Sequence, residues 1–371
     1  MSKILENITQ GALNSKAKLR IFLADLVYDT VKTNDVVPLN IGYLAALLDN
    51  ELGSQVDIKI FKYPMELEAA IKQAPPDVLG LSHYSWNALL DRLFLKMVKQ
   101  VNPDAVTVMG GPNTRLEPEE IEKFLRNLPD LDHYITFEGE QPFLSLIQAR
   151  LADEPLSEIM GCASIAKDMF TYHFIDPMKK KRTINGTSPY LSGWLDPFLK
   201  NPDLIPVLES NRGCPFSCTY CCWGVSALSL VRQRPLEIIF QEIDYIAEHS
   251  AGQVTWILAD ANFGILPRDL DIARKIREVM DKKGLPINVT LWNSKNTSKR
   301  NTEISETIGG NSFGLIAIQS SDLLVLKHAG RGKIKTGETK ASIDYYHEKW
   351  IPVATDLLIG RLPKETYQSH L

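Results

Sequence analysis

Three cysteines in one short stretch are the residues of this chain whose type and spacing indicate chemistry most directly. Cys214, Cys218 and Cys221 follow the spacing C-x3-C-x2-C within residues 209–224, ESNRGCPFSCTYCCWG. Thiolates are the soft ligands that iron–sulfur clusters need. Three of them can hold three irons of a four-iron cube and leave the fourth iron open, whereas a fourth thiolate would favour simple electron transfer. The pattern therefore predicts an open, catalytic cluster.

Two other interpretations of these cysteines stay open at this point. A structural zinc site usually combines two C-x2-C pairs or adds histidines, and no histidine lies between His173 and His249. Cysteines can also simply pack in a core. Cys222 directly follows Cys221, so we expect its side chain to point elsewhere, as a packing residue or a spare thiol. Cys162 stands alone and needs no function.

The cysteine stretch strongly resembles the radical S-adenosylmethionine (radical SAM) superfamily. Its members carry C-x3-C-x-aromatic-C, and Tyr220 supplies the aromatic here. The resemblance implies a [4Fe–4S] cluster on the three cysteines, chelated by the methionine end of S-adenosylmethionine. It also implies that Tyr220, Trp223 and Gly224 lie against that cofactor.

Composition sets the frame for this chemistry. A length of 371 residues predicts about two or three domains, and 44% hydrophobic residues can build full cores. The net charge of −4 offers no strongly basic surface, so it gives no reason to expect a nucleic-acid partner. We find neither a signal-peptide core at the start nor the ~18 consecutive apolar residues of a membrane helix. A soluble, cytoplasmic protein is expected, and the reducing cytosol favours metal-bound cysteines over disulfides.

The first part of the chain, residues 1–150, alternates short apolar runs with segments of helical periodicity. This alternation predicts an α/β domain with a doubly wound parallel sheet, Rossmann-like, covered by helices. The apolar runs and periodic segments give the expected elements, which are strands at 19–26, 56–61, 78–82, 105–109 and 133–136 and helices at 41–50, 66–73, 88–100 and 118–125.

Ligands of such sheets bind outside the carboxyl ends of the strands. The loops expected there resemble, in their joint order, the cobalamin-binding domain that precedes the catalytic barrel in one large group of radical SAM proteins. Taken singly, each loop also fits an ordinary turn or helix entry. The resemblance implies cobalamin contacts at Pro38, Leu39, Gly42, Ser82, His83, Tyr84, Gly110, Gly111, Pro112, Glu138, Gly139 and Glu140.

Histidine-ligated cobalamin domains carry the motif D-x-H-x-x-G, and neither His83 nor His133 lies within such a motif. We therefore expect no lower ligand from that motif. Ser82, His83 and Tyr84 are candidates to face the cobalt from below. A lone histidine in such a loop is more often a hydrogen-bonded structural group.

Residues 151–203 are less regular and are predicted to be a linker. The basic run 179–182 fits a solvated turn or a contact for an anionic substrate, and residues 187–198 resemble the connector that family members place before the barrel. Residues 204–371 are expected to form the first five units of a partial (β/α)6 TIM barrel. Their expected strands are 205–210, 254–259, 287–292, 313–319 and 354–359, with helices at 235–248 and 267–282.

Active sites of such barrels lie at the carboxyl ends of the strands. Asp260 and Asn262 follow the second strand and offer acceptors for an ammonium, where the family recognises the amino group of S-adenosylmethionine; they can also cap the next helix. The resemblance further places four residues against this cofactor, which are Asn293, Gln319, Ser320 and Ile359.

Near the end of the chain, two basic residues match the family pattern, whereas one glycine of the pattern is replaced. Lys327 and Arg331 resemble basic residues that follow the Gln-Ser segment, and are expected to pair with a carboxylate or phosphate. Lys364 stands where the family pattern has glycine, so close approach of the backbone to adenine is in question there.

The resemblance as a whole implies a cobalamin-dependent radical SAM enzyme, a methyltransferase acting on an unactivated carbon, with no catalytic residue beyond the cluster ligands. An electron from a flavodoxin or ferredoxin would cleave S-adenosylmethionine to a 5′-deoxyadenosyl radical, which activates a small-molecule or biosynthetic-intermediate substrate. Three alternatives remain, namely a ring-rearranging enzyme, a cobalamin-independent enzyme and an inactive fragment. Because the family's barrel has six strands and Leu371 precedes the sixth, the chain is expected to be truncated or completed by another chain.

Overall fold

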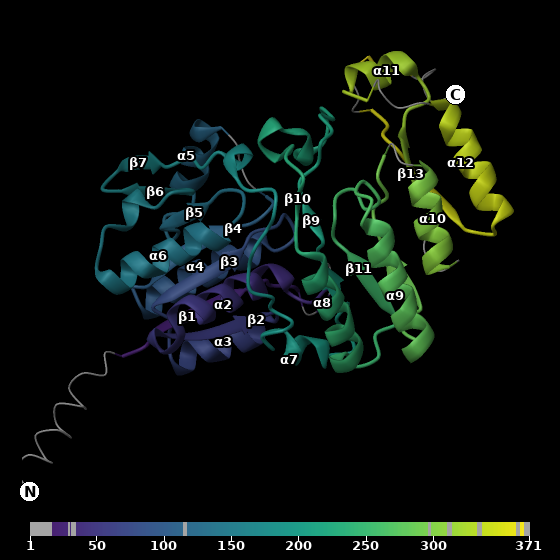
Figure 1. The fold of residues 1–371 in the computed structure, drawn as a ribbon. Coiled ribbons are helices and arrows are strands. Elements are labelled where there is room, and N and C mark those ends of the chain that lie inside the picture. The colour runs from purple at the N-terminus through teal and green to yellow at the C-terminus, as the bar shows by residue number, and fades with distance from the viewer. Residues whose placement is uncertain are drawn as a thin grey trace, which may run out of the picture. The chain divides into compact units, whose positions relative to one another are not determined.

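The computed structural model describes residues 17–28, 30, 35–113, 117–295, 298–309, 314–331, 336–360 and 364–366. They form two compact units (Figure 1). The first unit contains residues 38–175 and the chain before residue 35, and the second unit contains residues 35–37 and 176–371.

The first unit is built on one sheet with the strand order β2-β1-β3-β4-β5-β6-β7. Its first five strands are parallel. They are β1 (Leu19–Ala24), β2 (Val56–Phe61), β3 (Val78–Ser82), β4 (Val106–Gly110) and β5 (His133–Ile135), and the helices between and after them are α2 (Leu39–Leu52), α3 (Pro64–Gln73), α4 (Ala88–Val101), α5 (Pro118–Arg126) and α6 (Glu140–Ala152). In the order 2-1-3-4-5 the chain changes direction between β1 and β3, and ligands of such sheets bind at that switch point.

Helices cover both faces of this sheet, as a doubly wound fold requires. Side chains of α3, α4 and α5 share one core with Phe22 of β1 and Met109 of β4. On the opposite face, a side chain at Gly80 would meet Leu23 at 2.7 Å and Phe143 of α6 at 3.3 Å. The absence of a side chain at Gly80 thus lets α6 lie close against the sheet, and the predicted fold class is confirmed.

Two antiparallel strands extend the first sheet beyond residue 150. They are β6 (Cys162–Ala166) and β7 (Met169–Tyr172), and β6 pairs with β5. Lys167 and Asp168 connect them with φ angles of +49° and +63°, as a type I′ hairpin turn requires. The first compact unit therefore continues through this hairpin to residue 175, beyond the expected boundary at residue 150. The turn lacks the Asn-Gly or Asp-Gly signal that marks most hairpins.

The second unit alternates strands and helices. Its strands β8 (Val207–Leu208), β11 (Thr255–Leu258) and β12 (Asn288–Thr290) form a parallel sheet in the order β12-β11-β8, and β13 (Gly314–Gln319) pairs in parallel with β14 (Val353–Leu357). Within the described residues, no ladder joins β12 to β13. The helices are α7 (Asp196–Leu199), α8 (Leu236–His249), α9 (Asp269–Lys283), α10 (Ser298–Ile308), α11 (Leu323–His328) and α12 (Thr336–Glu348). A strand lies in each of the five places predicted for the barrel.

A short antiparallel ladder closes the base of the cysteine loop, which we define as residues 213–231. Its strands are β9 (Asn211–Arg212) and β10 (Arg232–Gln233). Directly after β10, Arg234 makes a buried ion pair with Glu242 of α8 at 2.6 Å, and Ser188 donates to the same carboxylate. These contacts tie the middle of α8 to the residue that follows β10 and to Ser188.

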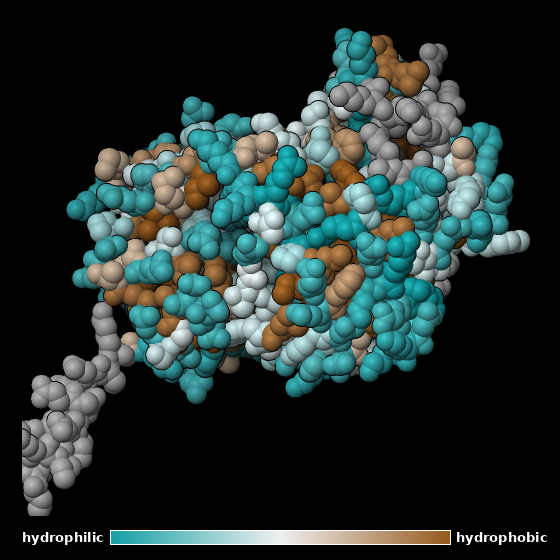
Figure 2. All heavy atoms as spheres, in the orientation of Figure 1, coloured by the Kyte–Doolittle hydropathy of each residue, from teal (hydrophilic) through white to brown (hydrophobic). Residues whose placement is uncertain are grey.

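The surfaces of the two units are mixed. In the view of Figure 2, hydrophobic residues lie among hydrophilic ones over the described part of the chain, as is usual for folded proteins. Among the described helices, none has the length and apolar character needed to cross a membrane.

Candidate functional site

The cysteine loop presents three thiols at different depths. Cys214 and Cys218 are buried, with 3% and 4% of their surface exposed, and Cys221 is half-buried. Cys222 is exposed, so it is a spare thiol rather than a packing residue. Cys162 is buried in β6, where burial raises the pKa of its thiol to about 12 and makes it unreactive.

Backbone hydrogen bonds hold the ligand positions of the loop. The Cys214 N–H donates to Leu228 O at 2.9 Å, and the Cys221 N–H donates to Cys218 O at 3.1 Å. Over the described ranges, no three His, Cys, Asp or Glu side chains meet as one bound ion requires. A cube places each thiolate on a different iron, so its ligands need not meet at one point.

Two glycines allow tight packing around Cys218. A Cβ at Gly224 would lie 2.1 Å from the carbonyl oxygen of Cys218. A Cβ at Gly330, which has a φ of +72°, would lie 2.4 Å from the carbonyl oxygen of Ser217. Each distance is far below van der Waals contact, so only glycine fits. The predicted residue Gly224 thus shapes the loop.

Two polar side chains reach the buried sulfurs. Asn262 Nδ2 donates to Cys214 Sγ at 3.1 Å, and Arg331 Nη1 lies 3.9 Å from Cys218 Sγ. The Arg331 side chain also donates to Ala317 O at 2.6 Å. Asn262 and Arg331 come from residues after β11 and β13, so distant parts of the chain converge on the cysteine loop. Donors to sulfur suit thiolates better than thiols.

Asp260, which the family resemblance placed near the ammonium of the cofactor, is already fully hydrogen-bonded. Its carboxylate accepts from Ser210 N at 2.7 Å, from Asn211 N at 3.1 Å and from Asn211 Nδ2 at 2.8 Å, and the Ser210 hydroxyl also bonds to it. Burial raises the pKa of Asp260 to about 7, although these bonds oppose the rise. This geometry favours a role in fixing the turn that enters β9. Neither Asp260 nor Asn262 caps α9, which has no side-chain hydrogen bond at its N-cap, Arg268. Asp269, the first residue of α9, accepts from the Gly264 and Leu266 N–H groups of the loop before the helix.

Several buried polar atoms after β12 and at the end of β13 have no hydrogen-bond partner among the described residues. They include both amide atoms of Asn293, the hydroxyl of Ser294 and Oε1 of Gln319. Gln319 also has a φ of +60°, which is uncommon for this residue type and costs of order 1–3 kcal/mol. Buried polar atoms normally find partners. These atoms therefore match the needs of a polar ligand at the strand ends.

The remaining predicted cofactor residues of the second unit differ in exposure. Tyr220 packs against Val325 and Ala329 of the α11 segment, Ser320 is buried, and Trp223 lies at the surface. Ile359 is 69% exposed and Lys327 is exposed. Lys364 has a φ of +63°, a conformation that glycine adopts without strain, which gives a physical reason for glycine in the family pattern.

His83 lies in a buried network after β3. Its Nδ1 is 3.0 Å from Asp91 Oδ2 on α4, and its Nε2 is 3.0 Å from Asn113 Nδ2. Burial raises the pKa of Asp91 to about 6, while its bond to His83 opposes the rise. Both ring nitrogens of His83 thus have partners within the protein, as in a hydrogen-bonded structural histidine.

Ser82 and Tyr84 share a partner that sequence reasoning missed. Asn40, at the start of α2, donates from Nδ2 to Ser82 Oγ at 2.7 Å, and it lies 3.3 Å from the Tyr84 hydroxyl. The Tyr84 ring stacks on Trp86 at 4.3 Å. Asn40 lies between the predicted residues Leu39 and Gly42. A polar residue at the start of a helix, between two predicted contacts, was the sequence signal that could have identified it.

The other predicted cobalamin residues also lie at the carboxyl ends of the strands. Gly111 has a φ of +134°, and a Cβ there would lie 2.9 Å from His83 O, so the loops after β3 and β4 touch. Gly110 ends β4 and Pro112 follows Gly111. Glu138, Gly139 and Glu140 lead into α6, and Pro38 precedes α2. All twelve predicted positions therefore lie at this edge of the sheet, either in the loops after β1, β3, β4 and β5 or in the strand ends and first helical turns that border those loops.

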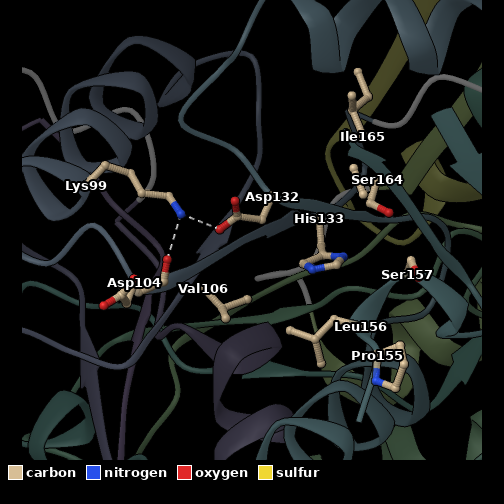
Figure 3. Close-up of a pocket in the computed structure, with 12 residues that line it drawn as sticks. Lys99, Asp104, Val106, Asp132, His133, Pro155, Leu156, Ser157, Ser164 and Ile165 are labelled. Atoms are coloured by element: carbon tan, nitrogen blue, oxygen red, sulfur yellow. Dashed lines mark hydrogen bonds and ion pairs between the residues drawn. The ribbon is translucent and has the colours of Figure 1, made fainter. Parts of the chain in front are cut away.

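A pocket at the opposite, amino-terminal edge of the first sheet contains none of these residues (Figure 3). Lys99 pairs there with Asp132 at 2.7 Å. His133 is 6% exposed and its Nδ1 has no hydrogen-bond partner. Burial lowers the pKa of His133 to about 4, although the Asp132 charge opposes this.

We expect His133 to make stability depend on pH. Its ordinary pKa is 6.5, so between about pH 6.5 and 4 the unfolded chain binds a proton that the folded chain does not. The free energy of unfolding should therefore fall as the pH falls, by up to about 3 kcal/mol. In His133→Gln this contribution should vanish. Urea denaturation of both proteins at pH 7 and pH 5 measures the difference, and an identical pH dependence would contradict the prediction.

The sequence of this chain is similar to one family model and to curated proteins. Residues 26–147 match the family model of the B12 binding domain. The chain is 31% identical over 350 residues to the cobalamin-dependent radical SAM methyltransferase TokK of Streptomyces tokunonensis, covering 90% of this chain and 50% of that protein. It is 33% identical over 310 residues to 2-(S-pantetheinyl)-carbapenam-3-carboxylate methyltransferase of Streptantibioticus cattleyicolor. This match covers 81% of this chain and 45% of that protein.

Solved structures agree in fold. The radical S-adenosylmethionine methyltransferase TsrM from Kitasatospora setae gives a TM-score of 0.72 at 13% identity, covering 95% of this chain and 69% of that one. The cobalamin-dependent S-adenosylmethionine radical enzyme OxsB gives a TM-score of 0.68 at 18% identity. The match covers 92% of this chain and 49% of that one. This chain spans about half the length of the two curated relatives named above. Residues 26–147 thus match a B12 binding domain, and over most of its length the chain is similar to cobalamin-dependent radical SAM methyltransferases.

Proposed function

We propose that this chain binds cobalamin in its first unit and a [4Fe–4S] cluster with S-adenosylmethionine in its second unit, as part of a radical SAM methyltransferase. The observation that carries the proposal is the cysteine loop. Its three thiols have the family spacing, and two of them receive side-chain contacts from Asn262 and Arg331. These contacts stabilise thiolates, the form that binds iron.

The donor set fits a cluster with one open iron. Cys214, Cys218 and Cys221 would hold three irons, and Cys222 is turned to the surface. When bound, the cluster supplies the electron that cleaves S-adenosylmethionine. The chain's own residues fix the loop through the β9–β10 ladder and exclude water from two of the three sulfurs.

S-adenosylmethionine would be held by the unpaired polar atoms at the strand ends. Asn293 offers both a donor and an acceptor, and Gln319 offers an acceptor. A ligand with ribose hydroxyls and an amino acid group can satisfy all three. Asp260 is assigned to holding the turn before β9, because its bonds are already made.

Cobalamin would lie at the carboxyl edge of the first sheet. The loops there contact one another through Gly111 and His83, and Asn40 holds Ser82 and Tyr84. Since both nitrogens of His83 are engaged within the protein, we propose cobalamin binding without a histidine ligand. Bound methylcobalamin supplies the methyl group.

The substrate is proposed to be a small molecule with an unactivated carbon. One relative is named for methylation of a 2-(S-pantetheinyl)-carbapenam-3-carboxylate, and this supports the substrate class. A flavodoxin or ferredoxin in the cytoplasm is proposed as the electron donor.

Anaerobic reconstitution tests the proposal. Iron and sulfide analysis should show a full cluster, and the electron paramagnetic resonance signal of the reduced protein should change when S-adenosylmethionine is added. Gel filtration after incubation with hydroxocobalamin should leave corrinoid absorbance on the protein. Zinc in place of iron, or a signal that S-adenosylmethionine leaves unchanged, would overturn the radical SAM assignment. Loss of all corrinoid would overturn the cobalamin assignment.

A further inference from the structure

Asn262 lies between a cysteine and a lysine. Its Nδ2 donates to Cys214 Sγ at 3.1 Å, while its Oδ1 accepts from Lys295 Nζ at 2.8 Å. Asn262 is 1% exposed. Its amide therefore already uses one donor position and one acceptor position within the protein.

Backbone contacts place Asn262 and Lys295 together. The Phe263 N–H donates to Trp292 O and the Ser294 N–H donates to Phe263 O, each at 2.8 Å. Residues 262–264 and 292–295 are thus held side by side just beyond β11 and β12. These bonds hold the backbone that leads to Lys295 beside Asn262.

Lys295 also contacts the cysteine loop directly. Its ammonium lies 5.4 Å from the ring centre of Phe216, a residue between Cys214 and Cys218. Within the described residues no carboxylate forms an ion pair with Lys295, and its partners are an amide and an aromatic ring. Neither partner cancels its positive charge, and the half-buried position weakens screening by solvent.

We infer that Lys295, acting through Asn262, raises the reduction potential of the cluster bound at Cys214; this rests on the proposed cluster. Reduction adds one electron from an external donor, [4Fe–4S]²⁺ to [4Fe–4S]⁺, and breaks no bond. The added negative charge is stabilised by an N–H donor to sulfur and by a nearby cation. Asn262 contacts the ligand, and Lys295 is a positioning residue that orients and polarises the Asn262 amide.

The test is a redox titration followed by electron paramagnetic resonance, on the anaerobically reconstituted full chain without S-adenosylmethionine. Lys295→Met removes the charge and keeps most of the stem. We expect it to shift the reduction equilibrium about tenfold toward the oxidised cluster, or ~59 mV for one electron. Asn262→Leu, which removes the donor to sulfur, should shift it in the same direction. Lys295→Arg should stay close to the wild type.

Lys299→Met is the matched control, because Lys299 is an exposed lysine four residues further along. It should leave the potential unchanged. Iron and sulfide content is measured first in every protein. A wild type without a cluster contradicts the proposed function itself. If the wild type and Lys295→Met both hold full clusters and have equal reduction potentials, this inference is wrong while the proposed function stands. The comparison of these two proteins is sufficient even if Asn262→Leu assembles its cluster poorly.

Discussion

Cys218→Ala is expected to abolish cluster assembly and leave the first unit folded. Cys218 is 4% exposed and its sulfur is approached by Arg331, so alanine removes one of three iron ligands and also the sulfur contact of a buried cation. Ligand loss in a three-thiolate site leaves two irons of the cube unsupported by protein. Iron and sulfide content after anaerobic reconstitution measures the effect.

Cys222→Ala provides the control for this experiment. Cys222 lies four residues further along the same loop and is exposed. Its replacement should leave iron content, sulfide content and the circular dichroism spectrum unchanged. A Cys218→Ala protein that still held the full complement of iron and sulfide would rule out the ligand assignment.

Gly224→Ala should lower cluster content nearly as far, without changing any ligand. The new Cβ would lie 2.1 Å from Cys218 O and 3.0 Å from Cys218 N. Both are backbone atoms, so the loop itself must move, which typically costs about 1–3 kcal/mol. A shift of the Cys218 backbone carries a ligand out of place. Iron analysis and thermal unfolding measure the two effects.

Gly186→Ala is the matched control, because a Cβ at Gly186 would meet no atom within 4 Å. Gly186 is also in the second unit, and its replacement should be neutral. Normal cluster content in Gly224→Ala would show that the loop tolerates displacement at Cys218, and would contradict the steric argument.

The parallel elements of the first unit could be predicted because their hydrophobic patterns are local. The predicted ranges 56–61 and 78–82 coincide with β2 and β3. The hairpin of β6 and β7 could not be predicted in this way, since its turn relies on Lys167 and Asp168 at positive φ. Aspartate tolerates that conformation, but lysine does not signal it, so the pair carries only half of the usual turn signal.

The candidate site divides in a similar way. The cysteines are recognisable from spacing, because a loop ligand set is local in sequence. The link from Cys214 through Asn262 to Lys295 joins three loops, and only the paired strands bring them together. Asp260 shows a second limit of the sequence, because a carboxylate at a strand end suggests a ligand site, whereas its bonds from Ser210 and Asn211 are visible only in the structure.

The cysteine loop is braced by residues that are made much later in synthesis. Thr219 N–H donates to Ala329 O, Gly330 packs against Ser217, and Arg331 reaches Cys218 across 113 positions of the chain. On a ribosome, the three thiols would emerge well before the residues that cover them. During that interval the thiols are open to oxidation and to foreign metals. A cluster delivered after residue 331 has emerged would meet a finished site, so the timing of delivery should govern how much active protein a cell obtains.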